Sequence, residues 1–156
     1  MIGHGEIEDA IREALMPLHR DQGGPLQTLS TADIFTVEEA VAAAKNTPSP
    51  SCSVVASSAD FSELRANGYH DAVHTVVLLI SARSYKSRGA AARGGEDRAG
   101  VYDLLKQTKQ ALLGREVLSG HGSELRIVRE WLLDTDQNLI IWAQEWKLRV
   151  YHAGVQ

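Results

Sequence analysis

The sequence predicts an α+β protein: a four-stranded, mainly antiparallel (mixed) sheet with helices packed on one face and a long C-terminal two-strand ribbon. Three observations predict it. Residues 76–80 are almost continuously apolar, which marks a strand buried on both faces. Residues 139–152 alternate apolar and polar side chains, the period of a half-buried strand. Residues 101–113 carry their apolar side chains at helical spacing.

The N-terminal stretch predicts a helix from about Glu6 to Met16. Its apolar residues recur at helical spacing, and acidic residues cluster in its first turn, where the helix dipole favours negative charge. On the side away from the apolar stripe we place Glu6, Glu8, Asp9, Arg12 and Glu13. Pro17 ends or kinks this helix.

The next segment predicts a short helix and a long-looped hairpin. Residues 26–35 are ambiguous between a strand and an extended connection, whereas Thr36-Val37-Glu38-Glu39 has the form of a capping box that opens a helix through Ala44. Residues 47–51 form a proline-rich turn before a strand at 52–58. A polar connection at 60–71 leads to the apolar strand at 74–85, so the two strands could pair antiparallel.

The C-terminal third supplies most of the predicted core. The helix at 101–113 lies between Gly100 and Gly114 and buries Leu104 and Leu105. Strands at 124–133 and 139–152 form the ribbon. Trp142 and Trp146 share one face of the second strand, and Gln144 is the polar residue among them.

Length and composition indicate one soluble domain spanning residues 1–156. The formal net charge of −4 argues against a surface that binds nucleic acid as a whole. A single cysteine, Cys52, fits a reducing cytoplasm and is expected to pack as a small apolar group. The N-terminus lacks the pattern of a signal peptide, and the longest apolar run is far short of the ~20 residues of a membrane span.

Sequence motifs for catalysis and metal binding are weak. His70 and His74 have the spacing of a helical zinc pair, but in a strand their rings would lie about 13 Å apart. Gly89 and Gly94 have the glycine spacing of a phosphate loop, yet Glu96 stands near the position where that loop needs a lysine and a hydroxyl. No nucleophile elbow is present. We therefore expect no enzyme activity, no metal and no cofactor.

A basic segment is the strongest candidate for function. Residues 86–100 are rich in glycine and alanine and carry Lys86, Arg88, Arg93 and Arg98. One interpretation is a solvated, flexible loop. The other is a loop that becomes ordered against a neighbouring subunit or DNA backbone, since the guanidinium group binds carboxylate or phosphate well. A loop of this length in a compact domain is unusual without a function.

The stretch from Arg98 to Gly114, RAGVYDLLKQTKQALLG, follows an apolar strand and a loose loop. It resembles the region of Mu-like phage tail proteins in which a G-x-Y-x-L-L helix follows the central strand. The opening Ile7-Glu8-Asp9-Ala10-Ile11 is similar to the N-terminal helix of that family, and the C-terminal ribbon fits it as well. The resemblance to the Mu-like tail terminator or tail-completion family covers most of the chain.

The resemblance implies a structural virion protein that forms a ring, usually a homohexamer. Such a ring caps the tail tube and joins it to the head–neck (connector) proteins, so the implied location is the neck of a virion assembled in the cytoplasm of a bacterial host. The basic loop is expected either to meet a neighbouring subunit or to line a lumen where it contacts DNA transiently. Two alternatives remain open: a small cytoplasmic hydrolase using His70 and Asp71, and a host regulatory binding module.

Overall fold

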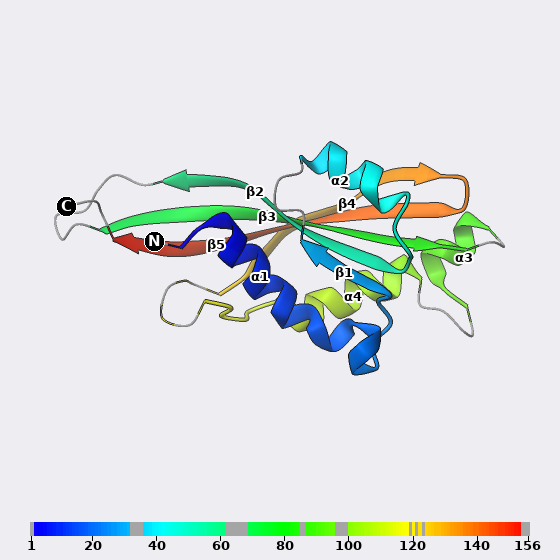
Figure 1. Cartoon of the computed structure of the whole chain (residues 1–156), viewed down its shortest axis with the longest axis horizontal. Coiled ribbons are helices and arrows are strands. Elements are labelled where there is room, and N and C mark those ends of the chain that lie inside the picture. The colour runs from blue at the N-terminus through cyan, green and yellow to red at the C-terminus, as the bar shows by residue number, and fades with distance from the viewer. Residues whose placement is uncertain are drawn as a thin grey trace.

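A computed structural model of the chain describes residues 2–31, 36–61, 69–84, 87–95, 100–118, 120, 122 and 124–153. The molecule is elongated and built on one twisted sheet (Figure 1). In chain order its elements are α1 (His4–Leu15), the short 3-10 helices η1 (Met16–Leu18) and η2 (Arg20–Gln22), β1 (Thr28–Thr31), α2 (Val37–Ala44), β2 (Ser51–Phe61), β3 (Tyr69–Arg83), α3 (Arg88–Arg93), α4 (Val101–Leu112), β4 (Arg126–Asp136) and β5 (Leu139–Ala153). No helix among the described residues is long and apolar enough to cross a membrane.

The strands lie in the order β1-β2-β3-β5-β4. β1 runs parallel to β2, and the other three pairings are antiparallel. This confirms the predicted α+β class, the mainly antiparallel sheet and the C-terminal ribbon of β4 and β5. The sheet has five strands rather than the expected four, because Thr28–Thr31 in the ambiguous segment pairs with Ser51–Val54. Four residues are too few to show a period-2 pattern in the sequence.

β3 is the central strand, as its apolar run predicts. Its side chains from Ala72 to Ala82 are buried or nearly so on both faces of the sheet. It pairs with β2 over Ser51–Phe61, so the predicted long-looped hairpin is confirmed with strands longer than expected. A β-bulge interrupts this pairing between Ala56 and Ser58.

The main hydrophobic core fills the space between the sheet and helices α1 and α4. We call this side of the sheet the α1/α4 face. On β3 and β5 its buried side chains come from alternate residues, as the pleat of a strand requires. They include Leu78, Ile80, Trp146 and Leu148 from the sheet, Ile7, Ile11 and Leu15 from α1, and Leu104, Leu105 and Leu112 from α4.

Helix α2 lies on the opposite face, which corrects the expectation that all helices pack on one face (Figure 1). Val41 of α2 packs against the buried Val55 and Leu79, and Ala44 is buried with Ile141. The physical reason is connectivity. Parallel neighbouring strands need a crossover connection, and α2 is the helix that connects β1 with β2. Residues on both faces of β3 are apolar, so the sheet can bury a helix on either side.

Both ends of α2 are held by side chains. Thr36 Oγ1 accepts a hydrogen bond from the Glu39 N–H at 3.2 Å, as the capping box predicts. At the C-terminal end Arg83 Nη2 donates to the Lys45 carbonyl oxygen, at 3.4 Å. Lys45 Nζ lies 3.0 Å from Asp134 Oδ2 of β4. The hydrogen bond from Lys45 lowers the pKa of the Asp134 carboxyl.

Glu8 of α1 is buried, with 2% of its surface exposed, although the sequence analysis places it on the outer side of the helix. Its Oε2 accepts a hydrogen bond at 2.7 Å from the N–H of Ala56, at the bulge of β2. The bulge displaces this N–H from the regular ladder, and the carboxylate satisfies it. Glu8 precedes Ile11 by three residues and Leu15 by seven, so helical spacing does place it beside the apolar stripe.

Candidate functional site

The basic segment contains a short helix where the sequence predicts a flexible loop. Ser87 caps α3 by accepting a hydrogen bond on its Oγ from the Ala90 N–H, at 3.1 Å. Ala91 and Ala92 are buried in the main core beside α4. The two alanines, which dilute the charge in the sequence, therefore attach this segment to the domain.

Gly94 and Gly100 approach each other closely. A Cβ atom on Gly100 would overlap the backbone nitrogen of Gly94 and the carbonyl oxygen of Ala92. Gly94 itself has a φ of 85°, in the left-handed region that favours glycine. Gly94 and Gly100 thus lie against each other directly before α4.

Of the four residues predicted to make contacts, two lie in the part of the chain that the structure describes. Arg88 and Arg93 begin and end α3, and both are exposed. Lys86 and Arg98 lie outside the described residues. The structure therefore presents two guanidinium groups on a short anchored helix, close to the tip of the β4–β5 ribbon (Figure 1).

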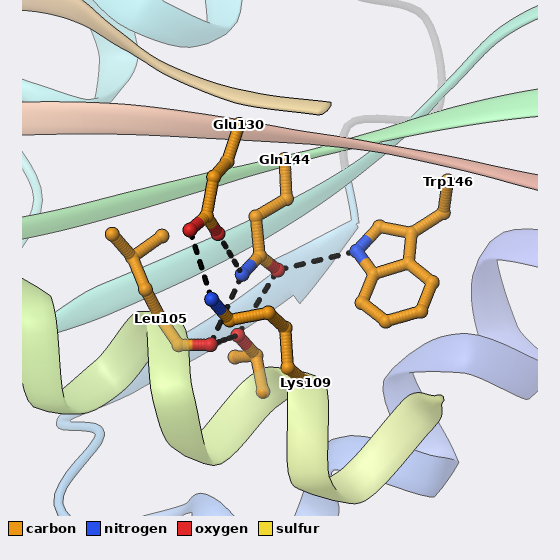
Figure 2. Close-up of polar contacts among 6 residues, drawn as sticks. Leu105, Lys109, Glu130, Gln144 and Trp146 are labelled. Atoms are coloured by element: carbon orange, nitrogen blue, oxygen red, sulfur yellow. Dashed lines mark hydrogen bonds and ion pairs between the residues drawn. The ribbon is translucent and has the colours of Figure 1, made fainter. Parts of the chain in front are cut away.

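A buried polar network joins α4 to the ribbon (Figure 2). Gln144 of β5 is fully buried. Its Oε1 accepts hydrogen bonds from Thr108 Oγ1 at 3.0 Å and from Trp146 Nε1 at 3.2 Å. Its Nε2 donates to the Leu105 carbonyl oxygen at 3.1 Å and to Glu130 Oε2 at 3.0 Å. Both amide hydrogens and at least one lone pair of the amide oxygen are thereby hydrogen-bonded.

The network also fixes which way the amide of Gln144 points. The indole N–H of Trp146 is a donor only and requires the amide oxygen, whereas the carboxylate of Glu130 requires the amide nitrogen. The Thr108 hydroxyl lies 2.9 Å from the Leu105 oxygen and 3.0 Å from Gln144 Oε1, so its single proton serves one or the other. Glu130 Oε1 completes the network with Lys109 Nζ, at 2.8 Å.

This arrangement is structural in character. Its polar groups bond one another across the interface of α4, β4 and β5, and a fully satisfied network in a low-dielectric core favours one packing over others. Of this network, the sequence predicts only that Gln144 and Trp146 share one face of the second ribbon strand. Glu130 and Lys109 are not predicted, because nothing in the sequence shows that β4 and α4 approach each other.

The predicted core residues occupy the positions expected of them with one difference. Leu104 and Leu105 are buried, and Trp146 has no exposed surface. Trp142 is half-buried, and its ring packs edge-to-face against exposed Tyr102 with centroids 6.0 Å apart. The Trp142 end of β5 therefore lies near the surface.

The histidine and cysteine candidates lie in the sheet. His70 and His74 both belong to β3, so they are separated along an extended strand, and His74 and Asp71 are buried. Within the described residues, no group of three or more His, Cys, Asp or Glu side chains is arranged to hold a metal ion. Cys52 is buried as expected, and burial raises the pKa of its thiol to about 12.

Comparison with known proteins gives a match in structure alone. No family model matches the chain, and no curated protein matches it. Among solved structures, it is similar to a chain of the virion of a native gene transfer agent (GTA) particle. The two share 16% sequence identity, with a TM-score of 0.57, over 94% of this chain and 96% of that chain. This chain therefore shares, over nearly its whole length, the fold of a protein in that virion.

Proposed function

We propose that this protein is a structural component of a phage-like virion, and that it caps the tail tube as an oligomeric ring joined to the head–neck proteins. The observation that carries the proposal is the fold shared over 94% of this chain with a chain of a virion particle. The sequence resemblance to Mu-like tail terminators at residues 98–114 supports the more specific role.

The shape of the domain supports a role in assembly. The ribbon of β4 and β5 is long, and β4 is an edge strand of the sheet formed by the described residues. Val128 and Leu132 on this strand are about half exposed, at 50% and 51%. Exposed apolar residues along a strand edge are typical of surfaces that pair with another protein.

The basic segment supplies a second contact. Arg88 and Arg93 are held at the surface by a helix whose alanines are buried, so little conformational entropy is lost when a partner binds them. Their partner in this proposal is either an acidic surface of the neighbouring subunit or DNA in the lumen of the ring. In both cases the ligand is an anion, which the planar guanidinium group binds well.

The proposed location is the neck of the virion, with synthesis in the cytoplasm of the bacterial host. The proposed partners are further copies of this chain, the tail tube protein and the head–neck proteins. The proposed role involves no reaction: contacts between surfaces perform it, and a ring forms when each subunit presents two different complementary surfaces.

The test is to purify the full chain and measure its mass in solution by light scattering, with imaging of the product. We expect a closed ring, the homohexamer that the family resemblance implies. Mixed with tail tubes, the ring should bind at one end of each tube and be seen there in particle images. A protein that stays monomeric over the full concentration range and leaves tube ends bare contradicts the proposal.

A further inference from the structure

One part of the sheet is not covered by a described helix on the face opposite α1 and α4. On this face α2 packs over Val55, Leu79 and Ile141. Figure 1 shows that α2 does not extend over the end of the sheet where the two termini lie. At that end the same face carries alternate residues of β5 beyond Ala143, together with the start of β4.

This uncovered end carries three basic side chains, together with the carboxylates of Glu145 on β5 and Asp71 on β3. Arg126 of β4 lies directly opposite Lys147 of β5 in the pairing register, and Arg149 follows on the same face of β5. Arg126 and Arg149 are exposed, and Lys147 is half-buried. We call these three residues the basic sheet patch.

Within one copy of the protein, the facing cations Arg126 and Lys147 of the patch repel each other. Like charges directly opposite each other on paired strands repel. Among the described residues neither Arg126 nor Lys147 forms an ion pair, whereas the adjacent Arg129 lies 3.5 Å from Glu145 and stacks over the Trp131 ring at 4.3 Å. A repulsive pair of cations on an open sheet face is neutralised when an anionic partner binds there.

The other side of the molecule carries a matching row of acids. Glu6, Asp9 and Glu13 lie on α1 at helical spacing i, i+3 and i+7, on the side of the helix away from the core, and all three are exposed. None of them forms an ion pair with a described residue. We call these three residues the acidic helix stripe. Arg12, between them in sequence, donates instead to the Leu29 carbonyl oxygen at 3.2 Å.

The two surfaces agree in size. Seven residues of α-helix extend about 10 Å, which is the length of the acidic helix stripe. Two residues along a strand and one step across to the next strand separate Arg149 from Arg126 by about 8 Å. The three carboxylates and the three cations therefore extend over similar lengths.

The two surfaces cannot meet within one copy, because α1 packs on the α1/α4 face and the basic sheet patch lies on the opposite face of the same sheet. A contact between two different surfaces of identical chains is heterologous, and it generates a ring when the rotation closes. We propose that the basic sheet patch of one subunit binds the acidic helix stripe of the next subunit. This inference rests on the proposed ring and assigns its subunit interface.

The neighbourhood of the patch favours a protein partner over DNA. Val128 on the adjoining edge strand is 50% exposed and offers apolar contact, which suits a protein surface. The chain as a whole has a formal net charge of −4, which disfavours a polyanion.

The experiment uses two charge-reversed forms of the full chain. One carries Arg126→Glu and Lys147→Glu, and the other carries Asp9→Lys and Glu13→Lys. Each form alone has two surfaces of like charge, so we expect its self-association to weaken about a hundredfold, while circular dichroism shows that it remains folded. Mixed in equal amounts, the two forms have complementary surfaces again and should assemble into rings in which they alternate. Light scattering and native mass spectrometry measure both results.

A matched control carries Lys106→Glu and Arg115→Glu, which reverse two exposed charges that belong to neither surface. It should assemble as the unmodified chain does. If both reversed forms assemble normally, the ring stands but this interface is wrong. If the unmodified chain never assembles, the proposed function fails and the interface with it. If the Arg126/Lys147 form loses affinity for duplex DNA in fluorescence anisotropy but still assembles, the patch binds DNA and the inference is overturned.

Discussion

The amide nitrogen of Gln144 lies 3.1 Å from the main-chain oxygen of Leu105, and this hydrogen bond joins strand β5 to helix α4 through the core. The amide oxygen of Gln144 accepts the indole proton of Trp146 on the same strand. A single polar side chain thus positions the helix and the largest buried ring with respect to each other.

Replacing Gln144 with Met tests the network while keeping its volume. The change leaves the Trp146 N–H without an acceptor in the core, so we expect the free energy of unfolding to fall by about 2–3 kcal/mol. Urea denaturation measures it. Gln110→Met is the control, because Gln110 is exposed on α4, and it should change stability by less than about 0.5 kcal/mol. Equal effects of the two substitutions would show that the network does not contribute.

Trp146→Ala tests whether the tryptophan face of β5 is a main source of stability. Trp146 is fully buried, so its loss removes apolar contacts and leaves a cavity, and we expect a cost of about 3–5 kcal/mol. Trp146→Phe keeps most of the ring and removes the N–H, so it should cost less. Thermal and urea unfolding measure both. A soluble Trp146→Ala protein with unchanged melting contradicts the structure.

Gly100→Ala tests the close approach at the end of the basic segment. A methyl group at this position would meet the backbone of residues 92–94, which cannot move without lifting Ala92 out of the core. We expect a loss of about 1–3 kcal/mol, the usual cost of overpacking. Gly89→Ala is the control, because its Cβ would meet only the Ser87 side chain at 3.7 Å. Hydrogen exchange in α3 should rise for Gly100→Ala and stay unchanged for the control.

The Cys52 thiol gives a prediction about pH. Burial raises its pKa to about 12 in the folded protein, so the folded state keeps the proton that the unfolded state loses above pH ~9. The part of the folding free energy that depends on the protonated Cys52 thiol is fully present below that pH and decreases as the pH rises toward 12. Between pH 8 and pH 10 the unmodified chain should lose about 1 kcal/mol more than Cys52→Ala does. Thiol reagents at pH 8 should label Cys52 only in denaturant, and rapid labelling of the native protein would contradict its burial.

Charge reversal at Arg88 and Arg93 tests the role of the basic segment. Arg88→Glu with Arg93→Glu should impair assembly of tails and leave the monomer folded, because both side chains are exposed and α3 is held by its buried alanines. Particle counts by electron microscopy and circular dichroism of the purified chain measure the two effects. Normal tails built with this variant would show that the segment has no role in assembly.

The sequence predicted the elements that carry a long local signal. The apolar stripe of α4 and the alternation along β5 gave boundaries close to those observed, at Val101–Leu112 and Leu139–Ala153. The cap at Thr36 located the start of α2. These features depend on neighbouring residues in the chain, so they can be predicted without knowledge of the fold.

The candidate site was only partly predictable. Arg88 and Arg93 are exposed, as the composition of the basic segment suggests, but the buried Ala91 and Ala92 make part of it a helix. The burial of alanine depends on whether α4 and β3 leave a space for it, and no periodicity over six residues reveals that space. The basic sheet patch was not predicted either, because Arg126 and Lys147 are 21 residues apart and meet only through the pairing of β4 with β5.

By itself, the sequence determined that α1, α2 and α4 are helical, that β2 to β5 are extended, and which sides of α4 and β5 are apolar, because hydrogen bonding and hydrophobic spacing within one element are local. The tertiary structure decided the rest: that Thr28–Thr31 is a strand, that α2 covers the opposite face, that Glu8 is buried at a bulge, and that Arg126 lies beside Lys147. Each of these depends on contacts between residues far apart in the chain, and their free energy exists only when the sheet has formed.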